Sequence, residues 1–415
     1  MNIKEINIIG LGFVGLTTAV GFADKGFKVN AIEVDKKKTN LLKKNKLYFN
    51  EPKLKEKYLN AKKKGLIFIK NKFELTDTKK YPNDKDKKTN IIFICIGTPI
   101  NKNGNYDLSK IKSFLTSLKR YKNDKFLVVI KSTVLPGTIK DIFKKFTNDN
   151  ISFCSNPEFL REGFAWNDFI KPDRIVIGCN DNKTKIILNN IYKKFNCIKI
   201  YTNTNTAEFI KIASNNFLSN TISFANNISL IAHKIDEVDI KLCFDALHKD
   251  KRWYGNPANM TGYLHPGIGY GGYCLPKDTT AFNFLSKRLF KNNFYIAENI
   301  KINNYLKNFY AKKIIKLSKP FKKICLLGLS FKHLSDDIRE SKAIELLQEL
   351  RKYKKEIICF DPIIKFIDTK VKYKIYKEPI FNKNYFYVLT VQWDNYIKFL
   401  KKIPKENFFD TRYIV

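Results

Sequence analysis

The stretch GLGFVG, residues 10–15, constrains the fold more than any other feature of this chain, because of what stands on either side of it. The β-branched run before it predicts a strand, and the residues after it have the spacing of a helix. In such a context Gly10 makes a tight turn, Gly12 lets a diphosphate approach the backbone, and Gly15 allows close packing of helix on strand. The stretch therefore predicts a dinucleotide-binding α/β unit with the diphosphate at the helix N-terminus.

An acidic residue at the end of the next predicted strand indicates which dinucleotide is bound. Residues 28–32 predict this strand, and Glu33 follows it, eighteen residues after Gly15. A carboxylate at this spacing bonds the adenosine ribose hydroxyls and repels a 2′-phosphate, so NAD is favoured over NADP. The lysines at 36–38 weaken that preference. We expect NAD to be held by this unit, through Gly10, Gly12, Phe13, Val14, Gly15 and Glu33.

Two further predicted strands run into loops that carry hydroxyl groups. Residues 90–96 lead into Thr98 and Pro99, and residues 126–130 lead into a loop with Thr133. In a doubly wound sheet the carboxyl ends of the strands line the ligand crevice, so we place Thr98 and Pro99 at the cofactor. Turn formation or helix capping is the commoner use of such residues and remains an alternative.

A long helix and a second α/β unit follow. Residues 206–234 have helical periodicity without Gly or Pro, and Lys211 and Asn215 share one face of that helix. Its apolar stripe consists of Phe209, Ile212, Ala213, Phe217, Ile222, Ala225 and Ile228. Beyond about residue 310, strands are predicted at 322–327, 356–360, 386–390 and 408–413, with a helix at 343–353.

These patterns predict an α/β fold with two doubly wound, Rossmann-like domains joined by a long central helix. We expect an NAD-binding domain at 1–204, a central helical and dimerisation domain at 205–305, and a substrate-binding α/β domain at 306–415.

Composition excludes several other classes of protein. The formal net charge of +38 comes from lysines scattered along the whole chain, without the aromatic-interleaved basic stripe of a nucleic-acid binder, so no nucleic-acid partner is expected. The eight cysteines stand singly, which predicts neither a metal site nor a disulfide framework. Glycines interrupt the early apolar run at 6–22, so we expect no membrane span and a cytoplasmic protein.

One cysteine stands in an unusual setting. The decapeptide GYGGYCLPKD, residues 269–278, puts Cys274 between a glycine-rich bend and a Pro-Lys-Asp trio. A cysteine considered alone is most often a buried, inert thiol. The glycines predict a loop that would pass close beneath a ligand, and Lys277 and Asp278 could tune the thiol and organise a water.

Eleven blocks in order along the chain resemble the UDP-glucose/GDP-mannose dehydrogenase family. They are GLGFVG, GTP with GNYDLS, KSTVLPGT, SNPEFLREG, DRIVIG, AEFIKIASN, GYGGYCLPKD, GLSFK, DDIRES, FDP and FDTR. The resemblance implies an NAD-dependent, four-electron oxidation of a nucleotide sugar at C6, converting UDP-glucose to UDP-glucuronate. It also implies that Cys274 forms a thiohemiacetal and then a thioester.

The resemblance also assigns roles to residues. The implied catalytic residues are Cys274, Lys211, Asp278, Glu158, Asn215 and Thr133. Glu162 and Arg339 would lie near the cofactor. The implied substrate-binding residues are Phe159, Leu160, Arg252, Tyr270, Gly271, Lys332 and Arg412, and Arg252 would reach the neighbouring subunit's site, which implies a homodimer.

Departures from the family pattern leave the substrate open. They are Trp253 and Tyr254 after the inter-subunit arginine, His333 after the Phe-Lys pair, and Asn227 late in the central helix. GDP-mannose or another UDP-sugar is therefore an alternative substrate. A two-electron hydroxy-acid dehydrogenase and a basic binding protein are more remote alternatives.

Overall fold

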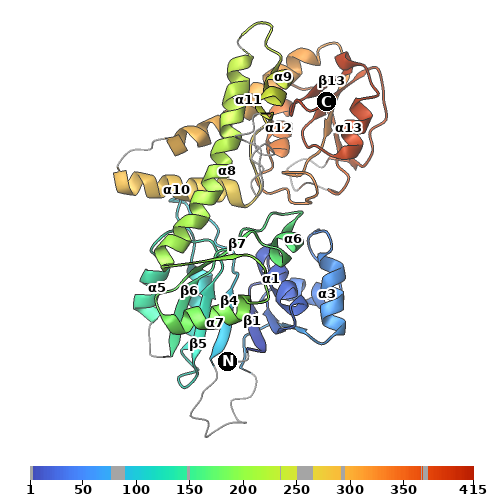
Figure 1. The fold of residues 1–415 in the computed structure, drawn as a ribbon. Helices are drawn as coiled ribbons and strands as arrows, with labels where there is room; N and C mark the ends of the chain where they lie inside the picture. Colours follow the sequence, from blue (N-terminus) through green and yellow to red (C-terminus); the bar gives the residue numbers. More distant parts are fainter. Residues whose placement is uncertain are drawn as a thin grey trace. The chain divides into compact units, whose positions relative to one another are not determined.

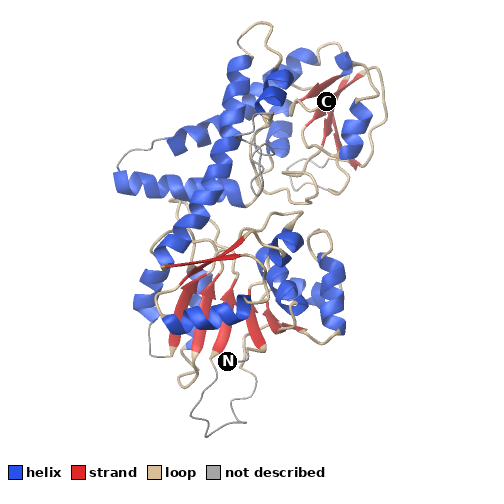
Figure 2. Ribbon diagram, in the orientation of Figure 1, coloured by secondary structure: helices blue, strands red, loops and turns tan. Residues whose placement is uncertain are grey.

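The computed structural model describes residues 3–75, 89–146, 150–233, 235–249, 265–290, 295–365, 367 and 373–415. The chain divides into two compact units, Met1–Ala213 and Ser214–Val415, and helix α8 (Thr204–Ala232) contributes to both. Each unit is built around one sheet, drawn in red in Figure 2, and its elements are labelled in Figure 1. The predicted division into three domains, at 1–204, 205–305 and 306–415, is not tested by these two units and stays a prediction.

The first unit has the strand order of a dinucleotide-binding sheet. Among the described residues its eight strands run in the order β3-β2-β1-β4-β5-β6-β7-β8, and the first six reproduce the order 3-2-1-4-5-6. The strands are β1 (Glu5–Ile9), β2 (Lys28–Ile32), β3 (Ile67–Lys70), β4 (Asn90–Ile94), β5 (Phe126–Ile130), β6 (Ile151–Ser155), β7 (Arg174–Gly178) and β8 (Ile198–Thr202). All neighbours pair in parallel except β6 and β7, which meet antiparallel at Ser155 and Gly178.

Helices cover both faces of this sheet because successive strand residues point to opposite sides. In β1, Ile8 belongs to one apolar core and Ile9 to another. The helices are α1 (Phe13–Asp24), α2 (Lys36–Lys43), α3 (Leu54–Lys63), α4 (Ser109–Leu118), α5 (Thr138–Phe146), α6 (Ala165–Ile170) and α7 (Asn182–Tyr192). Side chains of α1, α3, α6 and α7 fill the first core, and those of α4 and α5 fill the second.

The second unit repeats this design on a smaller scale. Its described strands form a parallel sheet in the order β11-β10-β9-β12-β13, again with cores on both faces. The strands are β9 (Lys323–Leu327), β10 (Glu356–Phe360), β11 (Ile375–Tyr376), β12 (Tyr385–Leu389) and β13 (Phe408–Asp410). The helices are α9 (Ile240–Leu247), α10 (Cys274–Phe290), α11 (Tyr295–Leu317), α12 (Lys342–Arg351) and α13 (Asp394–Leu400). The fold class predicted from the sequence is confirmed.

The apolar stripe of α8 is only partly buried within this chain. Ile212 and Ala225 are fully buried, but Phe209 and Phe217 are 46% and 56% exposed. The buried face of α8 is instead largely polar: Glu208, Lys211, Asn215, Asn216, Ser219, Ser223, Asn226 and Ser229. Polar groups can be buried when they are hydrogen-bonded. On this face, for example, the Ser223 hydroxyl donates to Asn299 Oδ1 at 2.6 Å.

The described part of the chain lacks membrane-spanning helices, metal-binding clusters and disulfides. No described helix has an apolar stretch long enough to cross a bilayer. No cluster of three or more His, Cys, Asp or Glu side chains there could hold a metal ion. No disulfide joins any of the cysteines, all of which are among the described residues.

Candidate functional site

The glycine loop after β1 has the geometry that a dinucleotide requires. Gly10 has a positive φ of +86°, and a Cβ on Gly15 would lie 1.8 Å from the Gly10 carbonyl oxygen, so α1 packs directly on the turn. A Cβ on Gly12 would meet nothing within 4 Å. The side of the loop where Gly12 lies is thus open, and α1 begins at the next residue with its N–H groups available to a diphosphate.

Glu33 lies against this loop. Its carboxylate accepts hydrogen bonds from the Leu11 N–H at 3.0 Å and the Asp35 N–H at 3.1 Å, and the residue is buried. The Tyr48 hydroxyl donates to the Leu11 carbonyl, and burial, with Glu33 nearby, raises the pKa of this tyrosine so that it stays a neutral donor. The open glycine, the helix N-terminus and the carboxylate together fit NAD.

The loop after β6 brings a carboxylate and a lysine together in a buried position. Glu158 Oε1 lies 3.1 Å from Lys211 Nζ, and the two side chains are each 5% exposed. The other oxygen, Oε2, accepts the Leu160 N–H at 2.6 Å. The Phe159 ring lies under two cations, with the Arg174 guanidinium 4.1 Å and Lys211 Nζ 5.5 Å from its centroid.

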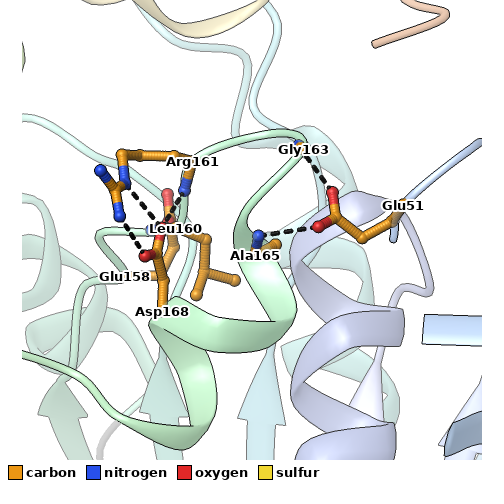
Figure 3. Close-up of polar contacts among 7 residues, drawn as sticks. All are labelled: Glu51, Glu158, Leu160, Arg161, Gly163, Ala165 and Asp168. Carbon is orange, nitrogen blue, oxygen red and sulfur yellow. Dashed lines mark hydrogen bonds and ion pairs between the residues drawn. The ribbon is translucent and has the colours of Figure 1, made fainter. Parts of the chain in front are cut away.

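Two acidic residues that the sequence analysis did not identify hold this loop, as Figure 3 shows. Glu51 is buried and accepts the N–H groups of Gly163 and Ala165, each at 2.8 Å, where α6 begins. Asp168 accepts two hydrogen bonds from the Arg161 guanidinium and one from the Arg161 backbone N–H. The sequence offers one indirect indication of Glu51: the first N–H groups of α6 need hydrogen-bond acceptors from outside the helix. This need does not reveal which residue supplies them.

The hydroxyls after β4 and β5 are bonded within the first unit. Thr98 Oγ1 donates to the Thr133 carbonyl at 2.8 Å, which ties the two loops together and is neither a turn nor a helix cap, and contact of Thr98 with the cofactor stays a prediction. Lys131, also not identified from the sequence, is buried with Nζ 3.3 Å from Asn156 Oδ1, and burial lowers the pKa of this lysine.

In the second unit Cys274 is the first residue of α10 rather than part of a loop. One turn later Lys277 and Asp278 form a buried ion pair, and the Asn215 side-chain amide donates to the same carboxylate. Asp278 is fully buried. The N-terminus of a helix carries a positive partial charge, which stabilises an anion at the position of Cys274.

The glycines before Cys274 are needed for packing inside the second unit. A Cβ on Gly271 would lie 2.2 Å from the Glu340 carbonyl oxygen, and one on Gly272 would lie 2.6 Å from the Phe331 ring. Neighbouring Tyr270 is held through its backbone by the Asn303 side chain, at 2.8 and 3.0 Å. These close contacts within the second unit are enough to explain why residues 271 and 272 have no side chain. Contact of the glycines with the substrate sugar stays a prediction.

The predicted cations of the second unit have defined partners. Arg339 forms a bidentate ion pair with Asp337 and lies over the Tyr273 ring, 4.5 Å from its centroid. Arg412 is half-buried and donates to Gln392 Oε1 at 3.2 Å, and burial of its guanidinium lowers the pKa of this arginine. Lys332 lies with Nζ 5.5 Å from the Phe331 ring centroid. Arg252 lies outside the described residues.

An open cavity of about 490 Å³ lies at the carboxyl ends of β9, β10 and β12. His333, Pro362, Gln392, Trp393 and Lys398 are among its lining residues. In doubly wound sheets ligands bind at this edge.

The predicted residues thus gather into two groups, one in each unit. Those brought together in the first unit are Glu158, Phe159, Leu160 and Lys211, with Thr98 and Thr133 bonded to each other through the Thr133 backbone. In the second unit Asn215, Lys277 and Asp278 are in contact, and Cys274 begins the same helix. Helix α8 carries Lys211 in one group and Asn215 in the other.

Comparison with known proteins gives matches along most of the chain. Three models of the UDP-glucose/GDP-mannose dehydrogenase family match: the NAD binding domain at 4–196, the central domain at 205–305 and the UDP binding domain at 325–415. A UDP-glucose 6-dehydrogenase of Rickettsia bellii is 35% identical over 367 residues, covering 86% of this chain and 81% of the relative. The UDP-glucose 6-dehydrogenase TuaD of Bacillus subtilis is 33% identical over 370 residues, covering 87% and 76%.

Solved structures include a similar protein. A UDP-glucose dehydrogenase from the hyperthermophilic archaeon Pyrobaculum islandicum superposes with a TM-score of 0.85 at 29% identity, covering 100% of this chain and 95% of that one.

Proposed function

Because the chain belongs to the UDP-glucose/GDP-mannose dehydrogenase family and is an NAD-dependent oxidoreductase, we propose that it oxidises the C6 alcohol of UDP-glucose to the carboxylate of UDP-glucuronate. The observation that carries the proposal is Cys274 at the N-terminus of α10, one turn before the buried Lys277, Asp278 and Asn215. An alcohol dehydrogenase that stops at the aldehyde has no use for this cysteine.

The first oxidation removes a hydride from C6, and the proton of the C6 hydroxyl passes to water. Bound NAD supplies the hydride acceptor. We assign Lys211 to stabilise negative charge on the C6 oxygen, because its ammonium is buried against Glu158 and so keeps its charge away from bulk water. Asn215, one turn further along α8, would contact the sugar, and Thr133 would lie near the reacting carbon.

The second oxidation needs a tetrahedral carbon, because a planar aldehyde has no hydride to give until a nucleophile adds to it. The Cys274 thiolate would add to C6 and, with a proton from water, form a thiohemiacetal. Its C–H bond would then give the second hydride to a second NAD bound in place of the first, and its O–H would lose a proton to water, which leaves a thioester. The positive end of α10 stabilises the thiolate before it attacks.

Hydrolysis completes the cycle. Water adds to the thioester carbon, the C–S bond breaks, and the thiol is regenerated with the carboxylate product. Asp278 is fully buried and bonded to Lys277 and Asn215, which suits a carboxylate that orients this water. Glu158 is the second carboxylate that we assign to this step.

Further residues are assigned to the substrate and to the cofactor. We assign the nucleotide and sugar to Phe159, Leu160, Tyr270, Gly271, Lys332 and Arg412, and the cofactor to the glycine loop with Glu33, Thr98, Pro99, Glu162 and Arg339. His333 and Gln392 line the cavity at the ends of β9, β10 and β12. Lys332 precedes His333 in the chain, and Arg412 donates a hydrogen bond to Gln392, so both cations stand next to lining residues.

We also propose a homodimer and a cytoplasmic location. Phe217 and Phe224 are 56% and 45% exposed and stand seven residues apart on α8, so they lie on one side of the helix. A second copy of the chain would cover such a row, and sedimentation analysis of the purified protein would measure its mass.

A panel of nucleotide sugars tests the substrate assignment. UDP-glucose, UDP-N-acetylmannosamine, UDP-galactose and GDP-mannose are each offered with NAD, and NADH release is followed. We expect UDP-glucose to be preferred in kcat/KM. A preference for GDP-mannose would favour the alternative that the family name includes, and release with none of the sugars would contradict the proposed function.

A further inference from the structure

Helix α8 carries a buried carboxylate that has no role in the steps above. Glu208 is 2% exposed and stands three residues before Lys211, so both side chains project from the same side of the helix. A carboxylate buried to this extent needs strong hydrogen-bond donors to remain there.

The donors come from the start of helix α5. Glu208 Oε2 accepts the Gly137 N–H at 2.7 Å, and Oε1 accepts the Ile139 N–H at 2.8 Å. Both N–H groups lie at the N-terminus of α5, where no carbonyl of the helix itself can accept them. Glu208 therefore acts as a helix cap supplied from about 70 residues further along the chain.

The segment held in this way is the loop that carries Thr133. At its other end the Ser132 hydroxyl donates to the Ile96 carbonyl at 2.6 Å, and Thr98 Oγ1 donates to the Thr133 carbonyl. Between these points Val134 and Leu135 are buried. The loop is thus fixed to the sheet at one end and to α8 at the other.

We propose that Glu208 is a positioning residue, whose carboxylate holds the Thr133 loop against the turn of α8 that carries Lys211. Lys211 is itself fixed to the loop after β6 through Glu158, so a single turn of α8 holds two of the loops assigned to the reaction. The inference rests on the proposed function only in treating Lys211 and Thr133 as groups that act at C6.

The charge state of Glu208 gives the inference a distinctive signature. Burial raises its pKa from 4.5 to about 7, and the N–H bonds from α5 oppose this rise. The charged groups around it are Asp141 on α5, which adds to the rise, and Lys211 on α8, which is paired with Glu158. Only the ionised carboxylate offers two full acceptors, so kcat should fall as the pH falls through about 7.

Glu208→Gln tests the inference because an amide has one acceptor and would turn its NH2 group toward a backbone N–H. We expect kcat with UDP-glucose to fall by about 10- to 100-fold, as small displacements of reacting groups do, while the KM for NAD changes little. The limb of the pH profile near 7 should disappear. Amide hydrogen exchange over residues 131–140 should become faster, which is measurable without any substrate.

Asp181→Asn is the matched control. Asp181 caps α7 in the same unit by accepting the Thr184 N–H at 2.7 Å, but α7 carries none of the assigned residues. We expect the control to lower the Tm and leave kcat, the pH limb and exchange over 131–140 unchanged. Glu208→Asp, which keeps the charge but is too short for both bonds, replaces Glu208→Gln if the latter does not fold.

Unchanged kcat, pH limb and exchange in the folded Glu208 variant would overturn the inference. Failure of the proposed function would look different, because the wild-type protein would then release no NADH from any nucleotide sugar. In that case the exchange measurement still decides whether Glu208 holds the loop.

Discussion

Cys274 is the residue on which the chemistry depends. Its sulfur stands at the positive end of α10, and the proposed mechanism uses it only after the first hydride has left. We predict that Cys274→Ser still binds NAD but loses turnover to UDP-glucuronate by several orders of magnitude, as loss of a covalent nucleophile does. Product formation is followed by chromatography.

Cys243→Ser provides the control for that variant. Cys243 is half-buried on α9, in the same unit, and has no assigned role. This variant should keep wild-type turnover. Full turnover by Cys274→Ser would remove the cysteine from the mechanism.

Glu33 is expected to select the cofactor. Its buried carboxylate is already bonded to the Leu11 N–H, and ribose hydroxyls would add charge-assisted hydrogen bonds worth about 1.5–3 kcal/mol. Glu33→Ala should therefore weaken NAD binding by about 10- to 100-fold, measured by calorimetry, with a smaller effect on kcat at saturating NAD. An affinity equal to that of the wild type would show that the ribose contact is misplaced.

Single residues also show where sequence reasoning reaches its limit. The roles of Gly10 and Gly15 follow from residues a few positions away and could be predicted. The packing of Gly271 depends on Glu340 and that of Gly272 on Phe331, about 70 and 60 residues further along the chain, so no local pattern could reveal it. The same holds for Glu51, whose donors at Gly163 and Ala165 are more than 110 residues away.

Among the elements, the strands were the most predictable. The ranges 28–32, 126–130 and 356–360 are confirmed to the residue, because buried parallel strands are continuous apolar runs bounded by polar or turn residues. Helix α8 was predicted within two residues at each end. Its buried face was not, because the periodicity of apolar residues cannot identify a face lined by Ser and Asn.

Helix α10 shows the opposite case of a signal that was present and not used. The glycines of the decapeptide predict a loop, yet Pro276 follows Cys274 by two residues, and proline is favoured in the first turn of a helix. That signal would have placed Cys274 at a helix N-terminus from sequence alone.

Directly after the end of α8 stands His233, whose burial makes the second unit sensitive to acid. Lys313 Nζ lies 3.1 Å from His233 Nδ1, and the Tyr413 hydroxyl lies 2.6 Å from Nε2. Burial, and then the charge of Lys313, lower the pKa of His233 to about 4. Between pH 6.5 and 4 the unfolded chain binds a proton here that the folded chain does not, so stability falls as the pH falls through this range.

His233→Gln should remove part of this dependence. We expect the difference in urea midpoint between pH 7 and pH 5 to be smaller in the variant than in the wild type. The pKa of His265 is also lowered to about 4 by burial, and it adds the same dependence to both proteins, so the comparison isolates His233. An identical pH dependence in both proteins would contradict the assignment.

At the scale of the whole molecule, the order of motifs was more informative than composition. The net charge of +38 invited a nucleic-acid interpretation, whereas eleven blocks in one order pointed to the family that three domain models then matched. The blocks fall in both compact units, which is why they indicated a member of the whole family rather than an isolated dinucleotide-binding domain.

The central claim is that one enzyme removes four electrons from one carbon, and the NADH formed per UDP-glucose consumed tests it most directly. Limiting UDP-glucose is converted to completion with excess NAD, NADH is measured by absorbance, and the sugar product is identified by mass spectrometry. The account predicts two NADH for each UDP-glucose and UDP-glucuronate as the product. One NADH per sugar, with an aldehyde as the final product, would contradict it.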